Sequence, residues 1–210
     1  MFIELVDALR CPVTHEESWL VASAVRTEAR HIVVGTLGCP VCSAEYPIRE
    51  GVADFRGGGT PANVAAAAPG SADAAMRLAA LLDLSDANGF AVLIGAWGNH
   101  ASELAALTEV PLLLVDPPHG VVGAPGISVL RCDGALPIAA GAARAMAFDG
   151  PVPGRIVSAV RATRVRGRVV GSASMAVPTE VRELARDEAL WVGERETPPS
   201  PLVSLHVRRS

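Results

Sequence analysis

The sequence predicts an α/β protein with two parts, a small N-terminal β-ribbon and a larger layered domain. From residue 71 onwards, short all-apolar segments of strand length alternate with amphipathic segments of helix length, the pattern of a mainly parallel sheet covered by helices. Before that, two strand-like segments lie between turns that contain cysteine. A stretch rich in glycine and alanine separates the two patterns and is typical of a linker. We therefore expect a ribbon at 1–56, a linker at 57–70 and an α/β domain at 71–210.

Composition excludes several classes of protein. The 210 residues are half hydrophobic, which suffices for one medium and one small core. A net charge of −4 argues against broad binding to nucleic acid. No apolar run approaches the roughly 18 residues that span a bilayer, and the N-terminus has no basic leader before an apolar core. We expect a cytoplasmic protein without a membrane partner, in which four cysteines indicate metal binding or free thiols rather than disulfides.

The ribbon carries a candidate metal site. Residues 2–9 predict a short amphipathic helix, and residues 19–25 and 31–37 predict strands. A Cys-Pro-x-Cys turn directs backbone N–H groups towards two thiolates. The turn at 39–42 has this form. In the turn at 11–14, Thr14 replaces the second cysteine, and a histidine follows it. The predicted metal is zinc, and its ligands would be Cys11, His15, Cys39 and Cys42. Alternatively, the ribbon has lost its metal and packs on the larger domain through Trp19, Tyr46 and Ile48.

These segments resemble a known family. A helix, then C-P-V, two strands, L-x-C-x-x-C and Y-P-I-R-E-G-V at 46–52 are similar to the zinc-ribbon family of small methyltransferase activators, over residues 2–56. Its members accompany tRNA, rRNA and release-factor methyltransferases, and some bacterial versions are fused to a methyltransferase domain. The resemblance implies a metal-binding ribbon that contacts a protein partner. Thr14 is the departure from the family pattern.

The organising stretch of the larger domain runs from Asn88 to Pro117. Ser71 caps a preceding helix that extends to residue 84. A buried strand at 90–94, a glycine-containing turn at 95–98, a helix from His100 and an apolar strand at 112–115 follow, and Asp116 ends the last strand. This is half of a doubly wound nucleotide-binding unit, in which the turn and the acid lie at the same carboxyl edge of the sheet.

The remaining elements extend this unit. Strands are predicted at 127–130, 145–148, 167–173, 189–194 and 202–208, and helices at 155–163 and 179–186. The last two strands form a hairpin-like pair, where a dehydrogenase would continue with another crossover helix. Residues 71–208 resemble the class I methyltransferases in layout. The resemblance implies a Rossmann-like, seven-stranded, methyltransferase-type sheet and a site for S-adenosylmethionine.

The cofactor site implied by this resemblance lies at Gly95, Trp97, Gly98, Asp116, Asp133 and Gly134. The family turn, acid-x-G-x-G-x-G, has lost its acid here and keeps two glycines. Trp97 either stacks on a flat ligand or fills an unused pocket. Asp116 stands at the position of the ribose-binding acid, or else caps a turn before two prolines. C-D-G-A-L-P at 132–137 resembles the segment that borders the adenine of the cofactor.

Two functions fit this pattern. The first is an S-adenosylmethionine-dependent methyltransferase, and the second is a non-catalytic binding or regulatory module that keeps the fold. No nucleophile or acid–base pair stands out, and His100, His119 and His206 are isolated. Five arginines between 155 and 168 indicate a solvated face rather than a nucleic-acid site. The sequence identifies neither the substrate nor the oligomeric state.

Overall fold

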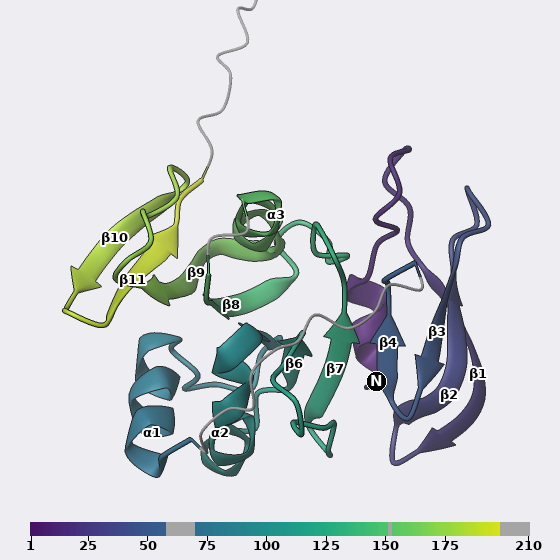
Figure 1. Ribbon diagram of the computed structural model, residues 1–210, viewed down its shortest axis with the longest axis horizontal. Coiled ribbons are helices and arrows are strands. Elements are labelled where there is room, and N and C mark those ends of the chain that lie inside the picture. Colours follow the sequence, from purple (N-terminus) through teal and green to yellow (C-terminus); the bar gives the residue numbers. More distant parts are fainter. Residues whose placement is uncertain (58–69, 151–152, 198–210) are drawn as a thin grey trace, which may run out of the picture.

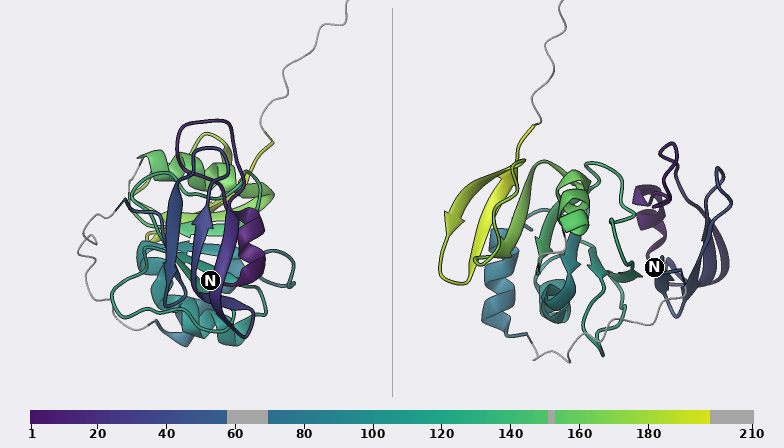
Figure 2. Two further views of the ribbon diagram at one scale, coloured as in Figure 1. Left: turned by 90° about the vertical axis from the view of Figure 1, so that its right-hand side faces the viewer. Right: turned by 45° about the horizontal axis from the view of Figure 1, so that its top comes forward.

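The computed structural model describes residues 1–57, 70–150 and 153–197 (Figure 1). All its strands belong to one sheet, ordered β1-β2-β3-β4-β7-β6-β5-β8-β9-β11-β10. The ribbon lies at one end of this sheet and the β10–β11 hairpin at the other (Figure 2). The prediction of a seven-stranded sheet was wrong, because the sheet formed by the described residues has 11 strands. The four strands of the ribbon extend it at one edge.

The ribbon is an antiparallel meander that follows a short 3-10 helix, η1 (Ile3–Ala8). Its strands are β1 (Val21–Glu28), β2 (His31–Gly38), β3 (Glu45–Arg49) and β4 (Val52–Asp54). The predicted amphipathic helix is therefore a 3-10 helix, which buries Leu5 and Val6. The strand predicted at 19–25 starts at Val21 and runs three residues further.

Strand pairing joins the ribbon to the rest of the protein. β4 runs parallel to β7 (Ile127–Arg131), with Val52 opposite Val129 and Asp54 opposite Arg131. Two backbone hydrogen bonds near the end of η1 reinforce the junction. Arg10 N donates to Pro137 O (3.0 Å), and Ala139 N donates to Ala8 O (2.8 Å). The edge of the larger sheet is thus completed by the ribbon, which satisfies backbone groups that an edge strand leaves open.

Two of the three predicted anchors of the ribbon are buried. Tyr46 and Ile48 lie in the core, and the Tyr46 ring stacks on Phe55 with 4.5 Å between centroids. Trp19 was wrongly expected there, since 60% of its surface is exposed. The guanidinium of the buried Arg10 lies over its ring, so Trp19 covers a charged group at the surface instead of entering the core.

The larger part is built around short parallel strands. Its elements are α1 (Ala72–Leu81), β5 (Ala91–Ile94), η2 (Gly95–His100), α2 (Ala101–Leu107), β6 (Leu112–Val115), β7, β8 (Ala143–Phe148), α3 (Pro153–Ala162), β9 (Thr163–Ser172), β10 (Val181–Arg186) and β11 (Leu190–Arg195). Every residue of β5 and β6 is buried, as strands with helices on both faces require. α1 and α2 pack on one face of the sheet and α3 on the other (Figure 1). None of the helices that the structure describes is long and apolar enough to cross a membrane.

The strand order is that of a nucleotide-binding sheet with a modified end. Counted from β5, the parallel strands lie in the order third, second, first, fourth, fifth, which is the beginning of the Rossmann order. β11 then pairs antiparallel with β9, and β10 with β11. The sheet therefore ends in a β10–β11 hairpin, in which β11 is the strand predicted at 189–194 and β10 is a strand that was not predicted.

The helix predicted at 179–186 is instead strand β10, and this prediction was wrong. Val181 is buried and the rest of β10 is exposed, so the segment has little apolar surface with which a helix could pack. The free edge of β11 supplies backbone partners instead, from Val181 opposite Arg195 to Arg186 opposite Trp191. Residues 202–208, the predicted last strand, lie outside the described residues, as does the linker at 58–69.

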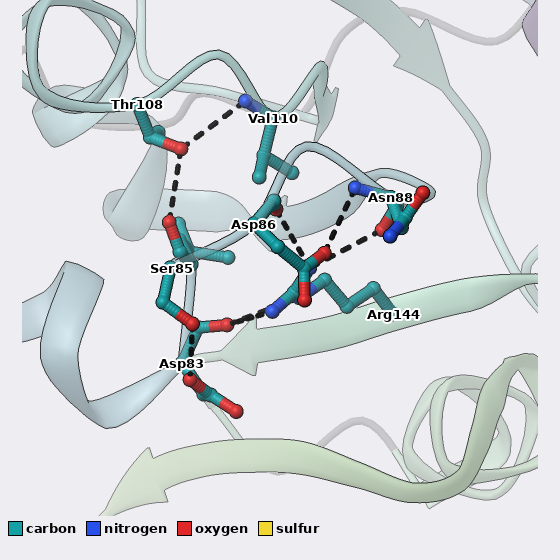
Figure 3. Close-up of polar contacts among 8 residues, drawn as sticks. Asp83, Ser85, Asp86, Asn88, Thr108, Val110 and Arg144 are labelled. Carbon is teal, nitrogen blue, oxygen red and sulfur yellow. Dashed lines mark hydrogen bonds and ion pairs between the residues drawn. The ribbon is translucent and has the colours of Figure 1, made fainter.

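A buried arginine holds the chain where it enters β5 (Figure 3). Arg144 on β8 is 3% exposed. Its guanidinium donates to the carbonyls of Asp83 (3.0 Å) and Asp86 (2.7 Å) and pairs with the Asp86 carboxylate. A buried guanidinium needs such acceptors because it has several N–H donors. The loop between α1 and β5 is therefore tied to β8, and the turn that follows β5 starts from a fixed position.

Candidate functional site

The predicted cofactor residues lie at the carboxyl edge of the parallel strands. Gly95 and Gly98 belong to η2 after β5, Asp116 directly follows β6, and Asp133 is the second residue after β7. In sheets of this type, ligands bind outside this edge, where the strand order reverses. The structure therefore brings the ends of the predicted strands to one edge. What the side chains do there decides whether a cofactor has room.

The turn after β5 is occupied by an acid from the end of β8. η2 is a 3-10 helix, and Gly95 has φ +65°. The Asp149 carboxylate accepts a hydrogen bond from Ala96 N (2.7 Å). A Cβ atom on Gly95 would lie 2.8 Å from Asp149 Cγ. The small residues that should let a ligand approach the backbone instead let Asp149 approach it.

Asp149 was missed by the sequence reasoning. It lies in the segment F-D-G-P-V-P-G at 148–154, directly after the strand predicted at 145–148. The sequence did contain a signal for it, because Asp149 directly follows one predicted parallel strand and the glycine turn directly follows another. Such a residue reaches the same edge as the turn.

Asp116 is paired within the protein. Its carboxylate lies 3.0 Å from the Arg155 guanidinium of α3 and accepts from Cys132 N (3.3 Å). Arg155 also donates to Cys132 O (2.7 Å). Burial raises the pKa of Asp116, and the positive charge of Arg155 only partly offsets this. Asp116 adopts φ +46°, which is unusual for a residue other than glycine. In this structure, the predicted ribose-binding acid therefore connects β6 with β7 and α3.

The other predicted residues differ in their surroundings. Trp97 packs against the apolar cluster on the α1–α2 face, and its ring centroid lies 6.0 Å from that of His100. A Cβ on Gly98 would lie 2.9 Å from Pro117 Cβ, so that glycine serves close packing. Asp133 and Gly134 are exposed, and a Cβ on Gly134 would meet nothing within 4 Å.

These contacts do not fit S-adenosylmethionine as they stand. The first turn has its Ala96 N–H directed to Asp149, and Asp116 has its carboxylate directed to Arg155. A ribose or a methionine moiety would have to replace both partners. Asp149 directly follows β8, and Arg155 lies in the first turn of α3, the next element of the chain. One segment of the chain therefore supplies both of the groups that occupy the edge.

The four predicted metal ligands come together in the ribbon. The ligand atoms of Cys11, His15, Cys39 and Cys42 all lie within 4.8 Å of one another. Cys11 Sγ lies 3.6 Å from Cys42 Sγ, and Cys39 Sγ lies 3.5 Å from His15 Nε2. Tetrahedral zinc with its usual bond lengths requires about 3.8 Å between two sulfurs and about 3.6 Å between sulfur and nitrogen. The group could hold a metal ion, and its spacing fits zinc.

Neighbouring groups favour thiolate at this site. Burial alone would raise the pKa of Cys39, but the backbone N–H groups of Cys42 and Val41 lower it to about 6. The Tyr46 hydroxyl lies 3.3 Å from Cys11 Sγ, and burial raises the pKa of Tyr46, so the hydroxyl stays protonated and can donate to sulfur. His15 contacts the Glu16 carbonyl through Nδ1, which leaves Nε2 facing Cys39.

Comparisons with known proteins give only distant structural likeness. No protein-family model matches the chain, and no curated protein does. A putative methyltransferase, yhhF from Escherichia coli, aligns at 14% identity and a TM-score of 0.38, over 69% of this chain and 99% of its own.

Two further solved structures share less of their length with this chain. Phosphoethanolamine N-methyltransferase 2 of Haemonchus contortus, solved with S-adenosylhomocysteine, aligns at 12% identity and a TM-score of 0.35, over 50% of this chain and 30% of its own. A geranyl diphosphate methyltransferase, solved with geranyl diphosphate and sinefungin, aligns at 17% identity and a TM-score of 0.34, over 54% of each chain. This chain therefore spans about a third to a half of the length of these two enzymes.

Proposed function

We propose that this chain is a methyltransferase-fold binding or regulatory module that has lost cofactor binding. The strand order with its closing hairpin supports the fold. One observation supports the loss of cofactor binding. Asp149 accepts the hydrogen bond of Ala96 N in the first turn, and Arg155 pairs with Asp116, so two groups that would bind S-adenosylmethionine already have protein partners. An acid and N–H groups without partners would favour cofactor binding. An acid and an N–H group that already have protein partners disfavour it, because those contacts must first be broken.

Calorimetry on the full chain tests this proposal. S-adenosylmethionine and S-adenosylhomocysteine should give no binding heat at millimolar ligand. Micromolar binding of either compound to the unmodified protein would overturn the proposal. Asp133→Ala then serves as the diagnostic variant, since a cofactor at the predicted edge should bind it more weakly, whereas a cofactor bound elsewhere should bind it equally well.

The second candidate is an S-adenosylmethionine-dependent methyltransferase of unknown substrate. The surroundings of Asp133 and Gly134 favour it, because both residues are exposed and the space around Gly134 is open. These residues resemble the segment that borders adenine in the family. The two candidates differ at the other half of the edge, where Asp149 and Arg155 lie.

We also propose that the ribbon binds one zinc ion in a structural role. Three thiolates and one imidazole fill all four positions of a tetrahedral site, which leaves no position for a substrate. A ribbon of this size has a small core, so a metal would stabilise it substantially. Elemental analysis of protein purified without chelator should give a zinc-to-protein ratio near one. His15→Ala should lower this ratio, whereas Thr14→Ala, a change in the same turn, should leave it unchanged.

The ribbon is also where we place a protein partner. Its surface exposes large apolar side chains near the metal ligands, among them Trp19 (60%), Val21 (61%) and Val41 (58%). Exposed apolar residues that gather in one region are typical of interaction surfaces. A partner that co-purifies with the unmodified chain should be lost from a Trp19→Ser variant. A partner retained by that variant would place the interaction elsewhere.

A further inference from the structure

Two of the three cysteines in the metal site of the ribbon are accessible to small oxidants. Cys42 is exposed and Cys11 is half-buried, whereas Cys39 is only 3% exposed. The loops that carry Cys11 and Cys42 project from the same end of the ribbon (Figure 1). Cys11 Sγ lies 3.6 Å from Cys42 Sγ, so rotation of the side chains suffices to bring the two sulfurs to bonding distance. An exposed thiol with a second thiol beside it is the arrangement found in redox-sensitive pairs.

The local backbone protects Cys39 from the same reaction. Cys39 N donates to Ala44 O (2.9 Å), and Ser43 N donates to Cys39 O (2.9 Å), which fixes the turn at 39–42. The Cys39 sulfur accepts from backbone N–H groups of this turn and lies 3.5 Å from His15 Nε2. All three sulfurs are thiolates when they bind a metal ion, so exposure decides which of them an oxidant reaches first. We therefore expect Cys42, and not Cys39, to react.

Cys11 is held where it can complete the reaction. Its sulfur lies 3.3 Å from the Tyr46 hydroxyl, and the Tyr46 ring is buried and stacks on Phe55, so the core fixes the position of the Cys11 side chain. The fourth cysteine, Cys132, is buried directly after β7 in the larger part of the protein. The sulfur that is both close to Cys42 and partly exposed is therefore that of Cys11.

We propose that Cys11 and Cys42 are an oxidation site, at which hydrogen peroxide forms a disulfide and thereby releases the metal ion. The Cys42 thiolate attacks one peroxide oxygen, so that an S–O bond forms, the O–O bond breaks and hydroxide leaves. The Cys11 thiolate then attacks the Cys42 sulfur, so that the S–S bond forms, the S–O bond breaks and a second hydroxide leaves. The two sulfurs together lose two electrons, and the peroxide gains them.

Disulfide formation removes two of the four metal ligands. Cys39 and His15 remain, and two ligands cannot complete the tetrahedral site that zinc requires. The release of zinc rests on the zinc site proposed above, whereas the disulfide requires only the two thiols. The bond joins the loop before β1 to the loop after β2, as a shared ion would. Oxidation therefore exchanges a metal link between these loops for a covalent one.

Treatment of the full chain with hydrogen peroxide tests the reaction. Protein purified without chelator is exposed to a small excess of peroxide, and peptide mapping by mass spectrometry without reductant should find Cys11 joined to Cys42. A chromogenic chelator should detect about one zinc ion released for each disulfide. Dithiothreitol followed by added zinc should restore the starting protein. A bridge between Cys39 and Cys42, oxidation of the thiols without a bridge, or zinc retained beside the bridge would overturn the proposal.

Two variants test the roles of the sulfurs. Cys132→Ser is the control, because Cys132 is buried away from the ribbon, and it should give the same bridge and the same release of zinc. In Cys11→Ser, the sulfenic acid on Cys42 has no partner, so dimedone should label Cys42. A variant without this label would show that Cys39 reacts in place of Cys11, which would contradict the assignment of the pair.

Elemental analysis of the same protein before oxidation separates this proposal from that of the zinc site. Protein that contains no zinc and still forms the bridge between Cys11 and Cys42 would refute only the zinc site. Protein that contains zinc and forms no bridge would refute only the oxidation site.

Discussion

The occupancy of the first turn by Asp149 can be tested with a double-mutant cycle. Gly95 has φ +65°, and alanine in this left-handed conformation costs about 1–2 kcal/mol. The new Cβ would also collide with the Asp149 carboxylate and displace it from Ala96 N. Loss of a hydrogen bond to a charged group costs about 1.5–3 kcal/mol, and partial exposure reduces this to about 1 kcal/mol here. Gly95→Ala should therefore destabilise the protein by about 2–3 kcal/mol.

The same substitution should be milder when the carboxylate is absent. In an Asp149→Ala background, only the cost of placing alanine in a left-handed conformation remains, so Gly95→Ala should lower the free energy of unfolding by about 1–2 kcal/mol. Urea denaturation followed by circular dichroism gives the four free energies of unfolding, and their coupling should be about 1 kcal/mol. Gly134→Ala is the control, because the space around Gly134 is open, and it should change stability by less than about 0.5 kcal/mol.

Additive effects would refute the reasoning. If the two substitutions add to within about 0.5 kcal/mol, Asp149 does not occupy the turn in solution. The edge of the sheet would then be open at Gly95, and the main argument against a cofactor would fall. The methyltransferase candidate would become the better of the two.

Two other predictions concern the buried arginine and the buried thiol. Arg144→Met removes a guanidinium that donates to the carbonyls of Asp83 and Asp86, and it should destabilise the protein by about 3 kcal/mol in urea denaturation. Arg182→Met is the control, because the Arg182 side chain is 58% exposed in its ion pair, and it should cost less than about 1 kcal/mol. Equal losses of stability in the two variants would contradict the role assigned to Arg144. Burial raises the pKa of Cys132 to about 12, so this thiol should resist iodoacetamide in the native protein at neutral pH and react after unfolding. Mass spectrometry measures the alkylation, and a modified Cys132 in the native protein would contradict the prediction.

The sequence by itself determined those features that depend on neighbours along the chain. Strands β5 and β6 were predictable because an all-apolar run of four or five residues, bounded by turn residues, can be buried on both faces. The N-cap of α1 was also predictable, since Ser71 Oγ accepts from Ala74 N at 3.1 Å. The four candidate metal ligands could be chosen from residue type and spacing, because residues that share an ion must bring their thiolate or imidazole atoms close together.

Only the tertiary structure decided which partner each edge and each polar group finds. β10 became a strand because the free edge of β11 provided backbone partners, which no local pattern reports. β4 joined the larger sheet through β7 for the same reason. Asp149 reaches a turn 53 residues earlier in the chain, and Arg155 pairs with an acid that follows another strand. A hydrogen bond or an ion pair forms only at contact distance, and the packing of distant segments alone sets that distance.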